Sequence, residues 1–218
     1  MSNTRLHILD TGRRLTAQRG FTAVGLTELL TAAEVPKGSF YHYFSSKEDY
    51  GVALLEHYVN GYSAEIGTSL GNDTLTGRDQ ILRYFEAWHL RQGDGPADRK
   101  CLIVKLAAEI SDLSPAMRAV LQGGVERIVA RLGGALRKAQ ADGSVAGVSE
   151  PDALAVTLYQ IWLGASLMAH LSQDAAPLAG ALRQTRALLP VATLKPPTLD
   201  PPTTEPSDGF EAAVVTSL

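Results

Sequence analysis

The sequence predicts an all-α protein, and three observations support this fold class. Few segments alternate apolar and polar residues with a period of two, and no Asn-Gly or Asp-Gly pair joins two such segments, so no β-hairpin is expected. Apolar residues recur instead at helical spacing as far as about residue 190. Hydrophobic residues make up 45% and charged residues 20% of the 218, which is the composition of a globular protein of one or two domains.

The first helices are delimited by residues that typically start or end a helix. Gly20 stands where a C′ glycine belongs, just after the first helix. Pro36 lies at or near the first turn of the third. Two overlapping capping boxes, beginning at Ser45 and Ser46, open the fourth, longer helix. The expected helices span residues 4–19, 26–33, about 36–44 and about 46–69.

The second part of the chain continues the same pattern. Ser114 followed by Pro115 is an N-cap with a proline at the first helical position, and Gly143 ends that helix. Trp88 and Trp162 are expected in the core, with the lining of a pocket as the alternative for either residue. The expected helices span residues 76–92, 99–111, 115–141, about 151–172 and 177–189.

The segment 190–218 differs in composition. It holds six of the eleven prolines, and from residue 191 one lysine against four acidic residues gives it a charge of −3. Such a segment cannot bury enough apolar surface to fold, so we expect a disordered tail. Residues 210–215 (FEAAVV) are the alternative, a short segment that docks on the folded part.

Composition also limits the cellular setting. A single cysteine excludes an intrachain disulfide and any zinc site built from cysteines. We expect no membrane span, because no apolar run approaches the roughly 18 residues that one needs, and no secretion, because the N-terminus lacks the apolar core of a signal peptide. We therefore expect a cytoplasmic protein with no membrane partner. His57, His89 and His170 are isolated on separate helices, so we expect neither a metal site nor a cofactor.

The residues from 36 to 44 (PKGSFYHYF) suit a helix that enters the major groove of DNA. Small residues at its start let the backbone approach closely, and Lys37 and Ser39 can reach bases or phosphates. The three residues 41–43 carry polar groups on aromatic rings that suit the DNA backbone. Lys47, at the start of the next helix, adds a charge beside backbone N–H groups that already favour phosphate.

Charge supports this interpretation, and one alternative competes with it. Residues 1–47 carry a net charge of +3 in a chain that is −3 overall. In the alternative, Phe40, Tyr41 and Phe44 are simply core aromatics. Phe40 and Phe44 lie four residues apart on one face and are expected in the core, which leaves Tyr41 and His42 to point elsewhere.

The segment 20–49 (GFTAVGLTELLTAAEVPKGSFYHYFSSKED) resembles the DNA-binding head of TetR-family repressors, above all in the run KGSFYHYFSSKE. The resemblance implies a homodimer with a helix-turn-helix domain (1–48), a bridging helix (about 46–69) and a helical sensing and dimerisation domain (49–189). It also implies a near-palindromic double-stranded operator as partner. By the same resemblance Tyr41 and Lys47 contact phosphate, and Lys37 and Ser39 contact bases. The implied DNA-binding residues are Thr27, Lys37, Gly38, Ser39, Tyr41, His42, Tyr43 and Lys47.

The segments 101–124 and 158–172 are similar to the NemR-like subgroup of that family, whose members respond to electrophiles or reactive chlorine through a cysteine. This resemblance implies that Cys101 is the sensing thiol. Where a lysine is expected in the later segment, this chain has His170, a different kind of partner that can act as a base or a hydrogen-bond donor.

The sequence around Cys101 independently favours a reactive thiol. Asp98 is placed to cap a helix that begins at Arg99, which would put Cys101 in the first turn, where free N–H groups favour an anion. Arg99 and Lys100 flank the cysteine, and Lys105 follows at i+4 on the same face. All of these are expected to raise the thiolate fraction. The products open to a single cysteine are an adduct, a mixed or intersubunit disulfide, or a bond to a nearby amine.

Two readings of the signal stay open. In the first, the repressor releases its operator when an electrophile or oxidant modifies Cys101, helped by Arg99, Lys100, Lys105 or His170. In the second, Cys101 is a structural residue of the apolar run 101–104, and a hydrophobic small molecule binds without a covalent bond. An enzyme is not expected, because no nucleophile elbow, zinc-binding helix motif or Gly-rich phosphate loop occurs.

Overall fold

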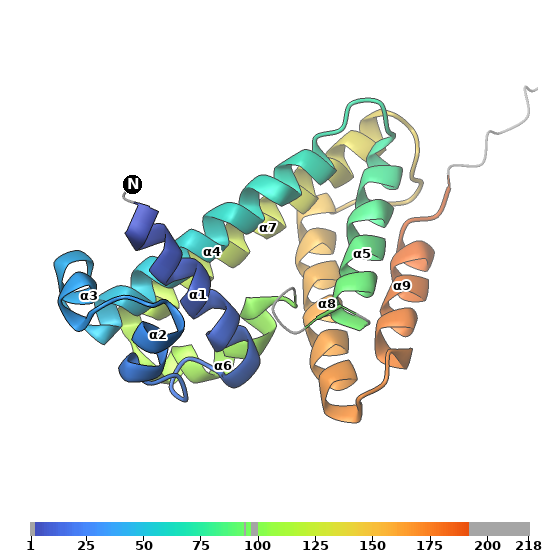
Figure 1. Cartoon of the computed structure of the whole chain (residues 1–218). Helices are drawn as coiled ribbons and strands as arrows, with labels where there is room; N and C mark the ends of the chain where they lie inside the picture. Colours follow the sequence, from blue (N-terminus) through green and yellow to red (C-terminus); the bar gives the residue numbers. More distant parts are fainter. Residues whose placement is uncertain (1–2, 94, 97–99, 192–218) are drawn as a thin grey trace, which may run out of the picture.

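The computed structural model describes residues 3–93, 95–96 and 100–191, and over these residues all regular structure is helical (Figure 1). The prediction of an all-α fold is confirmed. The helices are α1 (Asn3–Arg19), α2 (Leu26–Ala32), α3 (Lys37–Tyr43), α4 (Lys47–Leu70), α5 (Gly77–Gly93), α6 (Leu102–Leu113), α7 (Pro115–Ala141), α8 (Pro151–Ser172) and α9 (Ala176–Leu188).

Helix ends follow the predicted signals, with one exception. Gly20 ends α1 with φ +88°, a conformation that favours glycine. Ser46 is the N-cap of α4 and accepts a hydrogen bond from the Asp49 N–H at 3.0 Å. The exception is α6, which begins at Leu102 rather than at residue 99. Residues 97–99, which include the expected cap Asp98, lie outside the described residues, as does the tail from 192.

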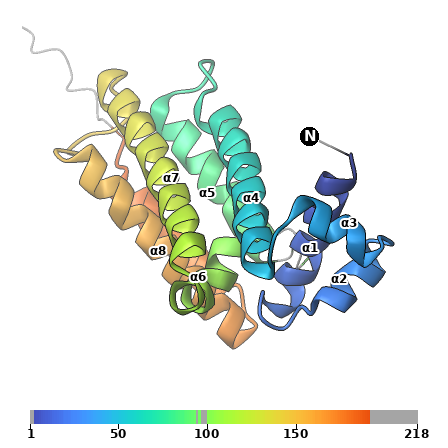
Figure 2. The same cartoon turned by 90° about the vertical axis from the view of Figure 1, so that its left-hand side faces the viewer.

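Helices α1 to α3 form a small head beside the N-terminal end of α4 (Figure 2). Ile8 of α1, Leu29 of α2 and Phe40 of α3 are buried together with the start of α4. At Gly12, a β-carbon would lie 1.6 Å from the Tyr50 hydroxyl oxygen, so only glycine lets α1 approach α4 this closely.

The larger part of the molecule is a bundle in which α4 and α7 pack along much of their length, with α5, α8 and α9 farther from the head (Figure 1). Trp88 and Trp162 are fully buried at its centre, as predicted. Their ring N–H groups donate to Ser166 Oγ and Thr185 Oγ1, each at 2.9 Å. Buried indoles are thus hydrogen-bonded, which avoids the cost of an unpaired polar group.

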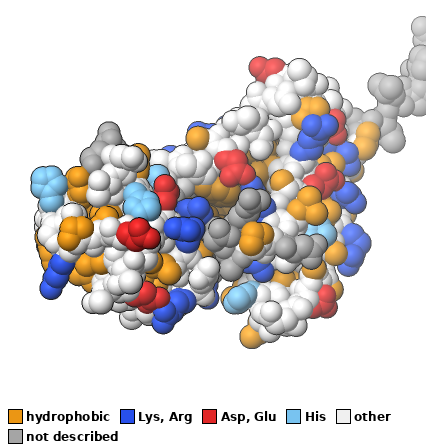
Figure 3. Space-filling model, in the orientation of Figure 1, with side chains coloured by type: hydrophobic (Ala, Val, Ile, Leu, Met, Phe, Trp, Pro, Cys, Tyr) orange, Lys and Arg blue, Asp and Glu red, His pale blue; other side chains and the backbone are white. Residues whose placement is uncertain are grey.

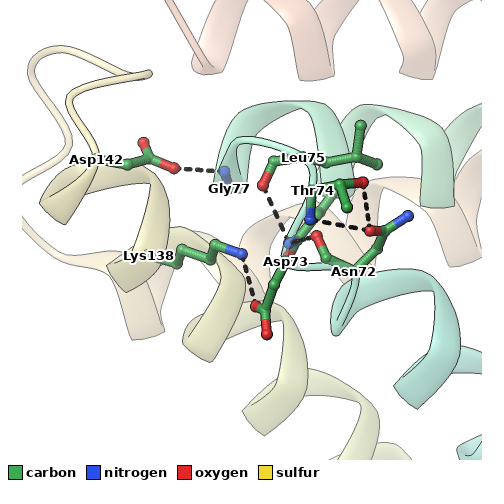
Figure 4. Close-up of polar contacts among 8 residues, drawn as sticks. Asn72, Asp73, Thr74, Leu75, Gly77, Lys138 and Asp142 are labelled. Carbon is green, nitrogen blue, oxygen red and sulfur yellow. Dashed lines mark hydrogen bonds and ion pairs between the residues drawn. The ribbon is translucent and has the colours of Figure 1, made fainter.

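Polar contacts fix the turn between α4 and α5 to the end of α7 (Figure 4). The Asp142 carboxylate accepts a hydrogen bond from the Gly77 N–H at 2.7 Å, and Lys138 Nζ lies 3.1 Å from the Asp73 carboxylate. Asn72 Oδ1 accepts from the Thr74 N–H at 3.1 Å and orders the turn itself. The end of the bundle remote from the head is therefore held by several independent bonds.

Helix α8 corrects one expectation. By length and composition it is apolar enough to cross a membrane, with a mean hydropathy of 1.3, so the expectation that no segment approaches this length and apolarity was wrong. Its small residues break the apolar run without adding charge. Such a helix is weak evidence for a membrane, since core helices of soluble proteins pass the same test. One face packs in the bundle, and the other exposes Val156, Leu167, Met168 and Leu171.

Candidate DNA interface and thiol site

Helix α3 is anchored by one face and exposed on the other. Pro36 is its N-cap in an extended conformation (φ −68°, ψ 153°), which turns the chain sharply after α2. Phe40 and Phe44 are buried, and their ring centroids lie 5.5 and 5.2 Å from that of Tyr50. The expectation that these two phenylalanines belong to the core is confirmed, so the aromatics between them are free to face outward.

The predicted DNA-binding residues come together on this outer surface. Tyr41 is 51% exposed, and Lys37 Nζ lies 6.0 Å from the centre of its ring. Thr27 of α2 and Lys37 line the same shallow depression between the two helices. Ser39 and Tyr43 are half-buried. The exposed members of the set are Thr27, Lys37, Gly38, Tyr41, His42 and Lys47.

The positive charge of the head is partly neutralised. Arg19 forms an ion pair with Glu28, and Lys47 Nζ sits 5.3 Å from the centre of the Phe21 ring. Figure 3 shows acidic and basic side chains interspersed over the face of the molecule drawn there. The face drawn there is therefore mixed in charge rather than uniformly basic.

Cys101 is the N-cap of α6, with φ −64° and ψ 117°, so the prediction that it lies in the first turn was wrong. The reason is that the helix starts three residues later than its charged residues suggested. The Tyr58 hydroxyl of α4 donates a hydrogen bond to Cys101 Sγ at 3.6 Å and accepts one from the Leu102 N–H at 3.0 Å. Tyr58 therefore joins the start of α6 to the middle of α4.

The pKa of the Cys101 thiol is raised above its ordinary value. Burial is the largest cause, and it outweighs the opposing effects of the Val104 N–H, the Tyr58 hydroxyl, the Ile103 N–H and the Arg91 charge. The expectation that the surroundings raise the thiolate fraction was therefore wrong as a net effect. The N–H groups at the start of α6 do favour the anion, but desolvation is stronger than they are.

Two cavities meet at Cys101. The first, about 460 Å³, lies between α4 and α5 and is lined by Tyr58, Tyr62 and Trp88 among others. The second, about 420 Å³, is lined by residues of α1, α6 and α8, including Lys105 and His170. Cys101, Lys100 and Gln92 line both. The thiol consequently has space on two sides into which an added group can extend.

Three of the four candidate helpers of Cys101 line a cavity together with the cysteine. Lys100 lines both cavities, and Lys105 and His170 line the second with the cysteine. Arg99 lies outside the described residues. His57 lines the first cavity with the cysteine, and its Nε2 lies 2.9 Å from the Asp10 carboxylate. In the described part of the chain, no group of histidine, cysteine and acidic residues is placed to hold a metal ion.

Sequence reasoning missed the residues that line the first cavity from α4 and α5. The rings of Tyr58 and Tyr62 are nearly parallel (8°), with centroids 5.9 Å apart, and Arg91 lies 5.7 Å from the centre of the Tyr62 ring. Their helical spacing, i and i+4 on α4, indicated a shared face. The sequence gives no signal that this face meets Cys101, 43 residues after Tyr58.

Helix α6 also contacts the head directly. The Glu109 carboxylate accepts hydrogen bonds from the Phe21 N–H at 3.1 Å and the Thr22 N–H at 2.6 Å. Burial raises the pKa of Glu109, but these bonds and the Lys105 charge outweigh it, so the pKa is lowered. At the end of α6, Ser114 Oγ donates to Glu48 of α4 at 2.5 Å. One helix thus begins at the thiol and is bonded to the head.

Comparison with known proteins agrees with this architecture. Residues 8–50 match the family of tetR-type bacterial regulatory proteins, and residues 77–185 match the tetracyclin repressor-like C-terminal domain. The chain is 41% identical over 187 residues to the HTH-type transcriptional repressor NemR of Escherichia coli K12, covering 86% of this chain and 94% of that protein. It is 34% identical over 174 residues to the transcriptional regulator AcuR of Cereibacter sphaeroides, covering 78% of each.

A solved structure extends the likeness to three dimensions. The crystal structure of the reduced form of E. coli NemR superposes with a TM-score of 0.84 at 41% identity, covering 88% of this chain and 100% of that one. Both domains are matched, and the order of head and bundle is the same. The chain therefore belongs to the TetR family of DNA-binding transcriptional repressors, which are regulators rather than enzymes.

Proposed function

We propose that this repressor holds its operator in the resting state and releases it when Cys101 is modified by an electrophile or oxidant. One observation carries the proposal: Cys101 lies between two cavities at the start of α6, and the Glu109 carboxylate of the same helix binds the backbone of the head. A change at the thiol therefore acts on a helix that positions the DNA-binding domain. The similarity to NemR supports the same conclusion.

The DNA half of the proposal assigns the operator contacts to the exposed surface of α3 and its neighbours. Lys37 and Ser39 contact base edges, and Tyr41 and Lys47 contact phosphates. Thr27, Gly38, His42 and Tyr43 complete the interface. The head comprises residues 1–48 and the sensing and dimerisation domain residues 49–189.

The operator-binding form is a homodimer. Exposed apolar side chains on α8 form a face that water would otherwise cover, and burying it against a second copy is favourable. In a dimer, two α3 helices enter successive major grooves of a near-palindromic site, about 34–36 Å apart. Binding through lysines and helix N-termini is expected to weaken steeply with salt.

The chemistry starts from the thiol, because burial raises the pKa of Cys101. The thiol first loses its proton to solvent, and the Tyr58 hydroxyl stabilises the sulfur anion. The thiolate then forms a carbon–sulfur bond with an alkyl halide as the halide leaves, or adds to an activated alkene that takes a proton at its other carbon. Hydrogen peroxide instead transfers one oxygen to sulfur, which is oxidised by two electrons to a sulfenic acid; the O–O bond breaks and the leaving hydroxide takes a proton from solvent to give water.

The added group occupies one of the cavities and displaces Tyr58 or the first turn of α6. Because α6 is bonded to Phe21 and Thr22 of the head, its movement changes the separation of the two recognition helices. A coupling of about 1–3 kcal/mol lowers operator affinity about 5–150-fold.

A second candidate keeps the fold and changes the signal. The same cavities bind a hydrophobic small molecule without a covalent bond, and Cys101 is structural. The raised pKa of the thiol and the partly buried aromatic wall formed by Tyr58, Tyr62 and Trp88 favour this alternative.

Operator binding by the purified protein distinguishes the two. An operator is selected from random duplexes, and its affinity is measured by fluorescence anisotropy before and after treatment with iodoacetamide. Wild type and Cys101→Ser are compared. Release in the wild type alone supports the thiol switch, and release in neither overturns it. Lys37→Ala and Tyr41→Ala test the interface: both are expected to weaken operator binding, whereas Lys138→Ala, at the remote end of the bundle, is the charge control.

A further inference from the structure

The space beside Cys101 contains a buried hydrogen-bond donor without an acceptor. Gln92 of α5 is 8% exposed and lines both cavities, and its Nε2 has no hydrogen-bond partner among the described residues. A buried N–H group without a partner is unfavourable, so such groups usually have an acceptor in the working state of a protein. The amide therefore marks a position for an acceptor atom supplied by a ligand.

The charges around the same space favour an anion. The first cavity is lined by Arg13, Arg91 and Lys100 against the single carboxylate of Glu65, which Arg91 already binds. His57, the remaining titratable group of that wall besides the tyrosines and the thiol, is bound to a carboxylate of α1.

The side chains that line the second cavity also carry a net positive charge. Arg19, Lys100 and Lys105 line it, with Glu109 as the carboxylate and His170 as the other titratable side chain besides the thiol. Arg19 is paired with an acid of α2, and Glu109 is bonded to the head. Lys100 is common to both cavities and has no ion-pair partner among the described residues.

We infer that this space binds a small organic acid, and that the electrophiles to which the thiol is best matched carry a carboxylate beside the reactive carbon. The carboxylate accepts a hydrogen bond from Gln92 Nε2 and lies near the charges of Lys100 and Arg91. The stacked rings of Tyr58 and Tyr62 provide the apolar wall for the carbon chain.

This inference deepens the proposed function and rests on it, since it names the class of compound that Cys101 meets. Binding before reaction places the reactive carbon next to sulfur and raises its local concentration. A bound carboxylate by itself disfavours the neighbouring thiolate, but the two cations offset that effect. The net result is selection among electrophiles by charge rather than by intrinsic reactivity.

The test compares two alkylating reagents that differ only in charge. Iodoacetate and iodoacetamide give the same carbon–sulfur bond with loss of iodide, and the chain's single cysteine makes the product unambiguous by intact-protein mass spectrometry. The ratio of the two rates is measured for the folded protein and divided by the ratio for the same chain unfolded in urea. We expect the normalised preference for iodoacetate to be about tenfold, as one hydrogen bond to a charged group provides.

Two variants assign the preference to residues. Gln92→Leu removes the donor at similar volume, and Lys100→Gln removes the shared charge. Each is expected to lower the normalised ratio towards one, and dividing one alkylation rate by the other removes any change in the reactivity of the thiol itself. Lys138→Gln, which has the same change in charge but lies at the end of α7, is expected to keep the full preference. Circular dichroism confirms that each variant is folded.

A second measurement does not depend on the variants. Propionate, which has no reactive carbon, is expected to protect Cys101 from iodoacetamide, whereas propionamide is not. The inference is overturned by a normalised ratio of one or less in the wild type, by equal effects of the two propionyl compounds, or by a preference that survives both variants.

The outcomes separate the inference from the proposed function. Operator release by iodoacetamide without any preference for iodoacetate supports the thiol switch and overturns the organic-acid site. A tenfold preference without operator release supports the site and overturns the switch.

Discussion

Replacing Tyr58 with phenylalanine tests how the protein controls the reactivity of its thiol. The Tyr58 hydroxyl donates to Cys101 Sγ at 3.6 Å, and this contact lowers a pKa that burial raises. Hydrogen bonds to charged groups contribute about 1.5–3 kcal/mol, and the long contact to sulfur places this one at the lower end. Because about 1.4 kcal/mol corresponds to a factor of ten in an equilibrium constant, we expect the Tyr58→Phe variant to raise the pKa of Cys101 further and to disfavour the thiolate about tenfold.

The rate of reaction is expected to cross over with pH. At neutral pH the thiolate fraction falls about tenfold, but a thiolate of higher pKa is a better nucleophile, with a Brønsted coefficient of about 0.4–0.5. The net rate at neutral pH therefore falls only about threefold to fourfold. Once both thiols are ionised, at high pH, the variant reacts about threefold faster than the wild type.

The assay is the pH profile of the reaction with 4,4′-dithiodipyridine, a neutral disulfide whose released thione is followed by absorbance. Tyr62→Phe is the matched control, because the Tyr62 hydroxyl lies 3.2 Å from the Tyr84 hydroxyl and makes no hydrogen bond to the thiol. An unchanged profile for Tyr58→Phe, or a shift of the same size in both variants, refutes the reasoning.

Three further predictions concern other parts of the molecule. Glu109→Ala removes two charge-assisted bonds to the head and is expected to lower the free energy of unfolding by about 1–3 kcal/mol and to uncouple operator release from Cys101 alkylation. The pKa of Glu109 is lowered in the folded protein, so the stability that its two bonds provide is present above about pH 4.3 and is lost as the pH falls through the lowered pKa. Urea titrations of the wild type and of Glu109→Ala should therefore converge in acid. Leu167→Glu, at a side chain 57% exposed on α8, is expected to leave monomer stability unchanged and to abolish the dimer in sedimentation analysis; a variant that stays dimeric contradicts the proposed interface. Gly77→Ala places a β-carbon 2.3 Å from the Ala139 backbone nitrogen and is expected to cost about 1–3 kcal/mol in thermal unfolding, whereas unchanged stability would show that α5 and α7 separate easily.

Much of the fold was predictable from local signals. Caps, C′ glycines and prolines act over a few residues, so the sequence located helix ends at Gly20, Ser46 and Pro115. The start of α6 was misplaced because charged residues before Cys101 are equally compatible with a loop. The outward position of the residues proposed to bind DNA was also predictable, since the spacing of Phe40 and Phe44 assigns one face of a short helix to the core.

The thiol site was predictable only in part, because its properties depend on distant segments. The sequence identifies the cysteine and the charges beside it, but the donor to its sulfur comes from α4 and the unpaired amide from α5. The net direction of the pKa shift depends on burial, which no pattern within a few residues of Cys101 reports. The charges near Cys101 in sequence therefore predicted one contribution to the pKa shift with the correct sign, but the larger contribution, desolvation by burial, was missed.

The raised pKa is compatible with a sensor and bears on how selective it is. A thiol with a permanently high thiolate fraction reacts with any electrophile at a rate set by that compound's intrinsic reactivity. A partly buried thiol that is mostly protonated reacts slowly with compounds that do not enter the cavities, and the bonds from Tyr58 and the start of α6 stabilise the anion at the reaction site. Selectivity then arises from what the cavities bind. A ligand held beside sulfur reacts faster because it is close, and this increase in rate offsets the decrease caused by the small thiolate fraction. On this reasoning, the residues that line the cavities, rather than those next to Cys101 in sequence, determine which signals the repressor detects.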